Sequence, residues 1–180
     1  GNLTDGPDGK LDEADIVYMG TATSKFYVGF GNTFTYKGFD LNIFFYGYLG
    51  RKLENPAYLS YLKGSNAILN GSNMLAEVTN RWAHDNPNGK FPTCLNSPYA
   101  NFSTDFWLEN ANFLRCKNIT LGYTLPKLGN FSKLVKNLRL YADVQNPFVI
   151  TKYSGIDPEM NGLAAYPTQT TMSFGVDITF

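Results

Sequence analysis

The chain has 180 residues, a formal net charge of +0 at pH 7 and an aromatic content of 16%, with 12 Tyr and 14 Phe. The length suggests one domain, and the neutral charge argues against nucleic-acid binding because no basic surface is available to replace phosphate counterions. No run of about 18 apolar residues is present, so the sequence predicts no transmembrane helix.

Residues 1–24 form an acidic, turn-rich segment that we interpret as a loop. Aligning Asp8 with position 5 of a calcium-binding loop places Asp12 at position 9 and Asp15 at position 12. Thr4 and Gly6, at positions 1 and 3, supply poor side-chain ligands. Asp8, Asp12 and Asp15 are therefore candidate Ca²⁺ ligands, and the alternative is a solvated acidic loop.

Residues 25–50 predict a hairpin. Even positions from Phe26 to Tyr36 are apolar except Asn32, and the odd positions are mostly small or polar. Lys37-Gly38 is a two-residue turn, after which the alternation restarts at Phe39. Two alternating segments separated by such a turn are typical of antiparallel strands.

Residues 51–105 lose this alternation and are rich in Pro, Asn, Ser and Gly, which predicts a long connection. Loops of this length in a compact domain usually carry function. A short helix capped by Ser72 is expected over residues 72–83. The single histidine, His84, has no accompanying Ser/His/Asp set, metal cluster or phosphate-binding loop. We therefore expect the protein not to be an enzyme.

Two further strands follow, at residues 111–125 and 137–145. In the first, Ile119, Leu121 and Tyr123 share the apolar parity, and extending that parity upward would place Arg115 and Lys117 on the apolar face. A charge there costs roughly 2–4 kcal/mol if the face contacts lipid. The sequence leaves two alternatives: a bulge near Lys117 reverses the face, or both charges lie at headgroup level.

The last twelve residues alternate without a break from Met172. The apolar set is Met172, Phe174, Val176, Ile178 and Phe180, and the other set is Ser173, Gly175, Asp177 and Thr179. A strand of about 9–11 residues spans the outer membrane when one face is apolar and the other polar. We interpret the chain as all-β: about five antiparallel transmembrane β-barrel strands, with the apolar sets facing lipid and the polar sets facing the lumen.

Loop lengths assign the two sides of the membrane. In bacterial barrels the periplasmic turns are short and the outer loops long. The connections at 37–38 and 126–136 would then be periplasmic, and the loops at 1–24, 51–105 and 151–168 extracellular. Five strands cannot close a barrel, so we expect them to pair with further strands.

Several linked motifs closely resemble the C-terminal barrel strands of the SusC/RagA family of TonB-dependent outer-membrane transporters. They are FYVGFGNTFTYKGFDL (26–41), FWLENANFLR (106–115), KNITLGY (117–123), LYA (140–142), QN (145–146), YSGIDPE (153–159), YP (166–167) and the ending on Phe180. On this resemblance residues 25–180 are the C-terminal part of the receptor barrel.

The resemblance implies a 22-stranded barrel with an N-terminal plug, capped by a SusD-like lipoprotein and powered by TonB, which imports oligosaccharides or peptides across the outer membrane. The plug and the TonB-contacting segment are not recognisable in these residues. The alternatives are a passive porin and a soluble β-sandwich that binds carbohydrate.

Aromatic residues on the lumen side and in the long loop are candidates for stacking on a sugar ring or a peptide side chain. They are Phe44, Tyr46, Tyr48, Trp82, Trp107 and Tyr141. The alternative is that they pack against the plug or rigidify the loops. A disulfide between Cys94 and Cys116 is left open, because partners cannot be told from sequence.

Overall fold

The computed structural model describes residues 16–63, 71, 73–93, 104–126, 134–160 and 165–180. The chain divides into two compact units. The loop unit contains residues 1–23 and 51–109, and the sheet unit contains residues 24–50 and 110–180. Within the described part of the chain, no helix is long and apolar enough to cross a membrane.

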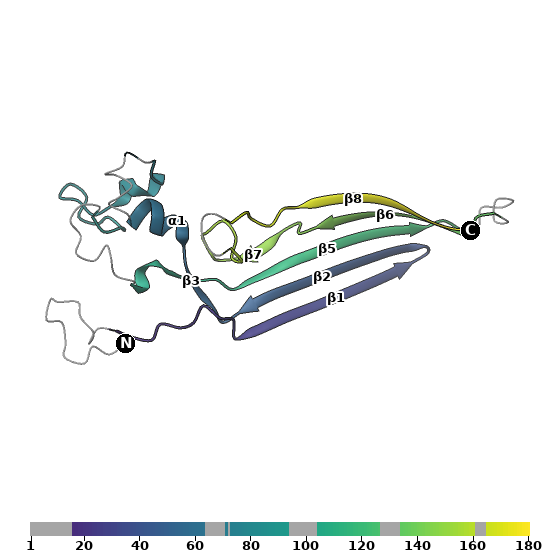
Figure 1. Cartoon of the computed structure of the whole chain (residues 1–180), viewed down its shortest axis with the longest axis horizontal. Helices are drawn as coiled ribbons and strands as arrows, with labels where there is room; N and C mark the ends of the chain where they lie inside the picture. The colour runs from purple at the N-terminus through teal and green to yellow at the C-terminus, as the bar shows by residue number, and fades with distance from the viewer. Residues whose placement is uncertain (1–15, 64–70, 72, 94–103, 127–133, 161–164) are drawn as a thin grey trace. The chain divides into compact units, whose positions relative to one another are not determined.

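The sheet unit is built on long antiparallel strands in the order β1-β2-β5-β6-β8, as Figure 1 shows, and the short β7 also pairs with β5. The bounds are β1 Phe26–Tyr36, β2 Phe39–Leu49, β5 Phe113–Thr124, β6 Asn137–Gln145, β7 Val149–Thr151 and β8 Thr171–Thr179. The five long strands predicted from the alternation are confirmed. In the described residues β1 and β8 each pair on one side only, so both edges of the sheet are open to further strands.

The turn between β1 and β2 requires the residues that occupy it. Lys37 and Gly38 both have positive φ, 45° and 86°, and Tyr36 pairs directly with Phe39. Two central residues at positive φ suit the right-handed twist of a two-residue hairpin. A Cβ atom on Gly38 would lie 2.7 Å from the carbonyl oxygen of Thr124, so glycine is also required sterically.

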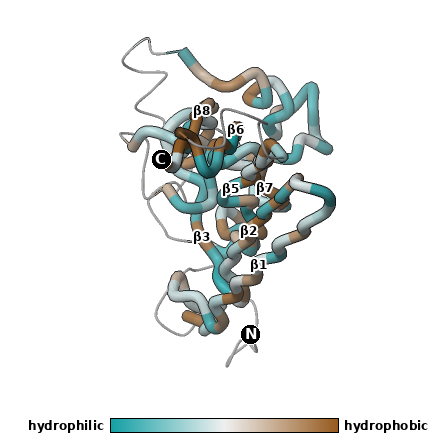
Figure 2. Tube along the Cα trace, turned by 90° about the vertical axis from the view of Figure 1, so that its right-hand side faces the viewer, coloured by the Kyte–Doolittle hydropathy of each residue, from teal (hydrophilic) through white to brown (hydrophobic). Residues whose placement is uncertain are grey.

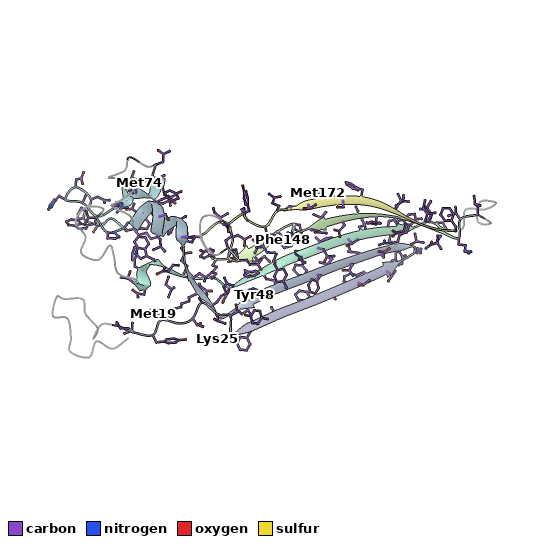
Figure 3. All side chains as sticks on the ribbon, in the orientation of Figure 1. Met19, Lys25, Tyr48, Met74, Phe148 and Met172 are labelled. Atoms are coloured by element: carbon purple, nitrogen blue, oxygen red, sulfur yellow. The ribbon has the colours of Figure 1, made fainter. Side chains whose placement is uncertain are left out.

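The register gives the sheet one apolar face and one polar face. The apolar face is largely exposed: Phe174 is 83% accessible, Met172 68% and Val176 55%. Met172 is labelled at the beginning of β8 in Figure 3, and Figure 2, which looks along the strands, shows apolar and polar residues in each of them. Such a continuous exposed apolar surface marks a face that contacts lipid or another apolar partner.

A β-bulge in β5 reverses the face of the strand. Phe44 pairs with Asn118 and Phe45 with Cys116, so Lys117 is an extra residue without a cross-strand partner. The side chains beyond the bulge therefore change sides, which puts Arg115 opposite Tyr46 on the polar face. Of the two alternatives for Arg115, the bulge is confirmed. The backbone N–H of Asn146, which has φ 50°, donates to the Lys117 carbonyl at 2.9 Å.

The loop unit holds short elements around a small core. These are β3 Lys52–Glu54, which pairs with β4 Leu108–Asn110, the helix α1 Pro56–Tyr58, the π-helix η2 Leu59–Lys63 and the 3-10 helices η3 Ala76–Asn80 and η4 Asp105–Trp107. Asn55 caps α1 by accepting from the N–H groups of Ala57 and Tyr58. The core consists of Leu62, Phe91 and Trp107.

The predicted helix over residues 72–83 is wrong in extent and type. The structure forms only the five-residue η3, which begins after Leu75, and no side chain caps it. The helix ends early because the backbone becomes extended at Arg81, where it forms a β-bridge to Phe91. Ser72 lies outside the described residues.

Candidate functional site on the polar face

A buried ionic cluster lies on the polar face at the end of the sheet that carries the long loops. Arg115 is 3% exposed, and its guanidinium donates to Asp157 Oδ1 at 2.7 Å and to Glu159 Oε2 at 2.8 Å. The Tyr46 hydroxyl donates to the same Glu159 oxygen at 2.8 Å. We call these four residues the Arg115 cluster. It fastens the segment after β7 to the strands, because β2 and β5 supply the donors and the loop supplies both acceptors.

Asp157 is the centre of the loop that the cluster holds. Its Oδ1 accepts from the backbone N–H of Glu159 at 2.9 Å, and its Oδ2 accepts from the N–H of Thr168 at 3.0 Å. Burial raises the pKa of Asp157, but these hydrogen bonds and the charge of Arg115 outweigh it, so the pKa lies below its ordinary value. The carboxylate therefore holds the backbone at Glu159 and at Thr168.

Aromatic rings cover the strands beside this cluster. The Tyr48 ring centroid lies 4.8 Å from that of Tyr27 and 5.0 Å from that of Phe113, and Tyr46 contacts Phe113 edge-on at 5.9 Å. Tyr48 is labelled at the corresponding end of β2 in Figure 3. Edge-to-face pairs stabilise beyond the area they bury. These rings therefore form a packed aromatic layer beside the Arg115 cluster.

Nearer the middle of the sheet, Phe44 lies over two glycines. Ideal Cβ atoms on Gly29 and Gly31 would lie 3.6 and 3.3 Å from its ring. The ring keeps 39% of its surface exposed. Beside it, the Asn42 side-chain amide donates to the Thr33 hydroxyl at 3.0 Å. The glycines leave room for the ring to lie flat on β1 while one surface stays accessible.

At the end of the sheet with the short turns, one arginine bridges three strands. Arg139 Nη2 lies 2.6 Å from Asp40 Oδ2, and Arg139 Nη1 lies 3.0 Å from Asp177 Oδ2. Its side chain crosses β5 at Gly122, where a Cβ would meet both Arg139 and Asp40 at 2.5 Å. The Tyr141 ring lies in the same way across Gly175 on β8. Glycines at both crossings let long side chains tie neighbouring strands together.

Four of the predicted ligand residues lie on the polar face. Phe44, Tyr46 and Tyr48 are on β2, whereas Tyr141 on β6 is level with Asp40 near the short-turn end, away from Tyr46 and Tyr48. Tyr46 is engaged with Glu159, whereas Phe44 keeps an accessible ring. The two predicted tryptophans belong to the loop unit. Trp107 is 4% exposed and stacks on Phe91 with ring centroids 6.3 Å apart, and Trp82 is 45% exposed beside His84.

The predicted calcium ligands Asp8, Asp12 and Asp15 lie outside the described residues. Among the residues that are described, no group of His, Cys, Asp or Glu could hold a metal ion. Cys94 also lies outside them, and Cys116 is a free, buried cysteine. The calcium site stays a prediction, and the disulfide, which the sequence leaves open, involves a residue outside the described part of the chain.

The Arg115 cluster was not foreseen, although two signals in the sequence point toward it. Arg115 breaks the apolar parity of its strand, and two carboxylates stand close together in the YSGIDPE segment, at Asp157 and Glu159. A charge out of phase in a strand needs a partner that satisfies it. Pairing the cation with that acidic segment would have located the contact.

Comparisons with curated proteins and with solved structures find relatives of this chain. No family model matches the chain. TonB-dependent receptor P3 of Formosa agariphila is 30% identical over 188 residues, and TonB-dependent receptor SusC of Bacteroides thetaiotaomicron is 31% identical over 178 residues. Both alignments cover 96% of this chain, but the chain spans less than a fifth of either relative, 18% and 17%.

Solved structures agree with these relatives. The RagAB peptide transporter matches 84% of this chain and 17% of its own, with a TM-score of 0.70 and 30% identity. The RagAB peptide importer in its closed-closed state matches 91% of this chain and 18% of its own, with a TM-score of 0.75 and 29% identity.

Proposed function

The chain belongs to the SusC/RagA family of TonB-dependent receptors, in which it matches a C-terminal barrel segment, and we propose that its five long strands form part of the wall of an outer-membrane transporter that imports nutrients. The match and the antiparallel sheet support this proposal. The apolar face contacts lipid, and the polar face lines the lumen through which the nutrient passes.

The observation that carries the proposal is the exposed apolar face. Phe174, Met172 and Val176 are all more than half accessible, and they lie on one side of an edge strand. A soluble β-sandwich would cover such a face with a second sheet, and in the described residues the long strands form a single layer. Lipid is the environment in which these side chains are stable without a protein cover.

The cargo that we propose is an oligosaccharide or a peptide. One relative is named SusC, and the neighbouring structures are titled peptide transporter and importer. On the lumen face, the flat and accessible ring of Phe44 would stack on a sugar ring or an apolar peptide side chain. Tyr141, which lies between strands over Gly175, offers a second ring of the same kind.

We also propose the partners of the family. A SusD-like surface lipoprotein would cap the barrel on the side of the long loops, and TonB would supply energy through a segment not recognisable in these residues. The loop unit, with its own core around Trp107, is a folded element available for contact with the lipoprotein. No bond-making chemistry is proposed.

Two arginine substitutions in β8 test the assignment of the faces. Val176→Arg puts a guanidinium on the apolar face and should cost roughly 2–4 kcal/mol if that face contacts hydrocarbon. Ser173→Arg puts the same group on the polar face beside Asp143, which pairs with Ser173, and should cost far less. The measurement is the yield of heat-modifiable barrel in outer membranes from cells that express the full-length transporter. Equal yields, or a worse defect for Ser173→Arg, would contradict the assignment.

A separate uptake experiment tests the cargo. Cells that carry or lack the full-length transporter receive a labelled mixture of oligosaccharides and peptides, and only the transporter-dependent class should accumulate. Phe44→Ala should reduce this uptake, whereas Phe30→Ala, on the apolar face, should not. Loss of uptake in both variants would indicate a structural role for Phe44.

A further inference from the structure

A groove of about 490 Å³ opens on the apolar face near the end of the sheet that carries the long loops. Val28 and Leu49 line one side of it, and Leu114 and Ile150 line the other. The cross-strand register explains why a hollow forms there: Val28 pairs with Gly47, Gly47 with Leu114 and Leu114 with Ile150. Gly47 contributes no side chain to this row of apolar residues.

Gly47 cannot be replaced by a larger residue to fill the row. A Cβ atom at this position would clash with the carbonyl oxygen of Phe113, because β5 approaches β2 closely above the bulge. The hollow is therefore a consequence of the backbone arrangement. Its volume lies within the roughly 300–1,000 Å³ of small-molecule pockets.

The rim of the groove is polar and carries one cation. Lys152 lines it together with Asn110 and Asn112, and the Asn112 Oδ1 atom accepts from the Gly50 N–H at 2.7 Å. Among the described residues, no carboxylate forms an ion pair with Lys152. The groove thus combines an apolar floor with a single uncompensated positive charge at one end.

The height of Lys152 places this charge at the membrane surface. Lys152 follows β7 and is level with Phe26, ten residues from Tyr36 along β1. Ten residues rise about 33 Å along a strand, or about 25 Å along the membrane normal at a tilt of about 40°. An outer-membrane barrel has an apolar band about 25 Å tall, so with Tyr36 at the inner interface Lys152 reaches the outer one.

We propose that the groove binds an acyl chain of a phosphate-bearing lipid of the outer leaflet, with the phosphate at Lys152. This inference rests on the proposed function, because it requires the apolar face to contact lipid. A soluble peptide would not reach a groove that opens toward hydrocarbon, and a neutral lipid would gain nothing from the lysine. A phosphate beside an acyl chain matches both halves of the site.

Native mass spectrometry of the full-length transporter, extracted in mild detergent, tests the proposal through the lipids that stay bound. Lys152→Gln should reduce retention of phosphate-bearing lipid by roughly five-fold, the loss expected when one lysine at the surface no longer attracts an anionic lipid. Val28→Trp should fill the groove and reduce retention of phosphate-bearing and neutral lipid alike. Ile150→Trp fills it from the opposite wall, should Val28→Trp fail to assemble.

Two matched controls lie elsewhere on the same sheet. Lys136→Gln removes a lysine at the short-turn end, and Val176→Phe enlarges an apolar side chain on β8, away from the groove. Both should retain lipid as the unaltered protein does. Equal retention in the groove variants and the controls would overturn the proposal, and so would displacement of the lipid by inorganic phosphate alone, which would indicate an anion site without an acyl chain.

The two proposals fail differently. If the proposed function is wrong, the unaltered full-length protein does not form a heat-modifiable barrel in the outer membrane. If only the lipid site is wrong, the barrel forms and imports its cargo, but lipid retention does not respond to Lys152→Gln or to the groove-filling variants.

Discussion

Replacing Arg115 by methionine should be among the most destabilising single changes in the sheet unit. Arg115 is 3% exposed, and its guanidinium contacts two carboxylates, at 2.7 Å from Asp157 and 2.8 Å from Glu159. Methionine fills much of the same space but carries no charge. The variant therefore leaves Asp157 buried without its cation, while Glu159, whose side chain is 24% exposed, keeps some access to water.

The expected cost is about 3–5 kcal/mol, which is typical when one partner of a buried ion pair is removed. A second change should recover part of it: Glu159→Gln removes one of the two stranded carboxylates. In the Arg115→Met background this substitution should be harmless or stabilising, whereas in the unaltered protein it should destabilise. The reversal of sign distinguishes the ionic contact from a simple loss of packing.

The assay is urea unfolding of the reconstituted full-length transporter, followed by proteolysis of the segment after β7. Lys117→Met is the control, because Lys117 is the exposed bulge residue two positions away, and it should change stability by no more than about 0.5 kcal/mol. The segment around Asp157 should become protease-sensitive in Arg115→Met only. If Arg115→Met is no worse than Lys117→Met, the cluster does not hold the loop.

Gly175→Ala should impair assembly because its Cβ would clash with the Tyr141 ring, and adding Tyr141→Ala should restore the barrel seen on heat-modifiability gels. Because the pKa of Asp157 is depressed on folding, its stabilising effect is complete above the unfolded pKa of about 4 and is lost as pH falls through the folded value, so thermal midpoints should decline below pH 4 and less so in Asp157→Asn. Calorimetry with calcium should show weak uptake by the acidic segment, and no uptake at millimolar concentration would remove that site.

The strands and their faces could be predicted because successive residues of a strand point to opposite faces of the sheet, so odd and even positions identify the face. Phe174 and Ser173 were assigned to opposite faces from alternation alone, and the register with Ala142 and Asp143 agrees. The turn at Lys37-Gly38 could also be predicted, since glycine is one of the few residues suited to its backbone conformation. These features are local, so a short window of sequence contains them.

Contacts between segments that are distant in the sequence could not be predicted in the same way. The core of the loop unit joins Leu62, Phe91 and Trp107, which show no shared periodicity. The segment 151–168 was expected to be only a loop, yet Thr151 ends β7, and Asp157 is buried against β5. Such contacts depend on where irregular backbone turns in space, and composition alone does not determine that.

The bulge at Lys117 has a consequence for how this wall tolerates change. The bulge separates two stretches of regular β2–β5 pairing whose registers differ by one residue. The lower stretch lies toward the short turns, and the upper stretch lies toward the long loops. A single-residue insertion or deletion elsewhere in β5 would move every side chain between that point and the nearest loop to the opposite face of the sheet. At Lys117 the strand already contains the extra residue, so a change of length at this point would alter the pairing of one stretch and leave the register of the other unchanged. The lower stretch, with Arg139 bridging Asp40 and Asp177, would act as a fixed frame, and the upper stretch with its loops would be free to diverge among related chains.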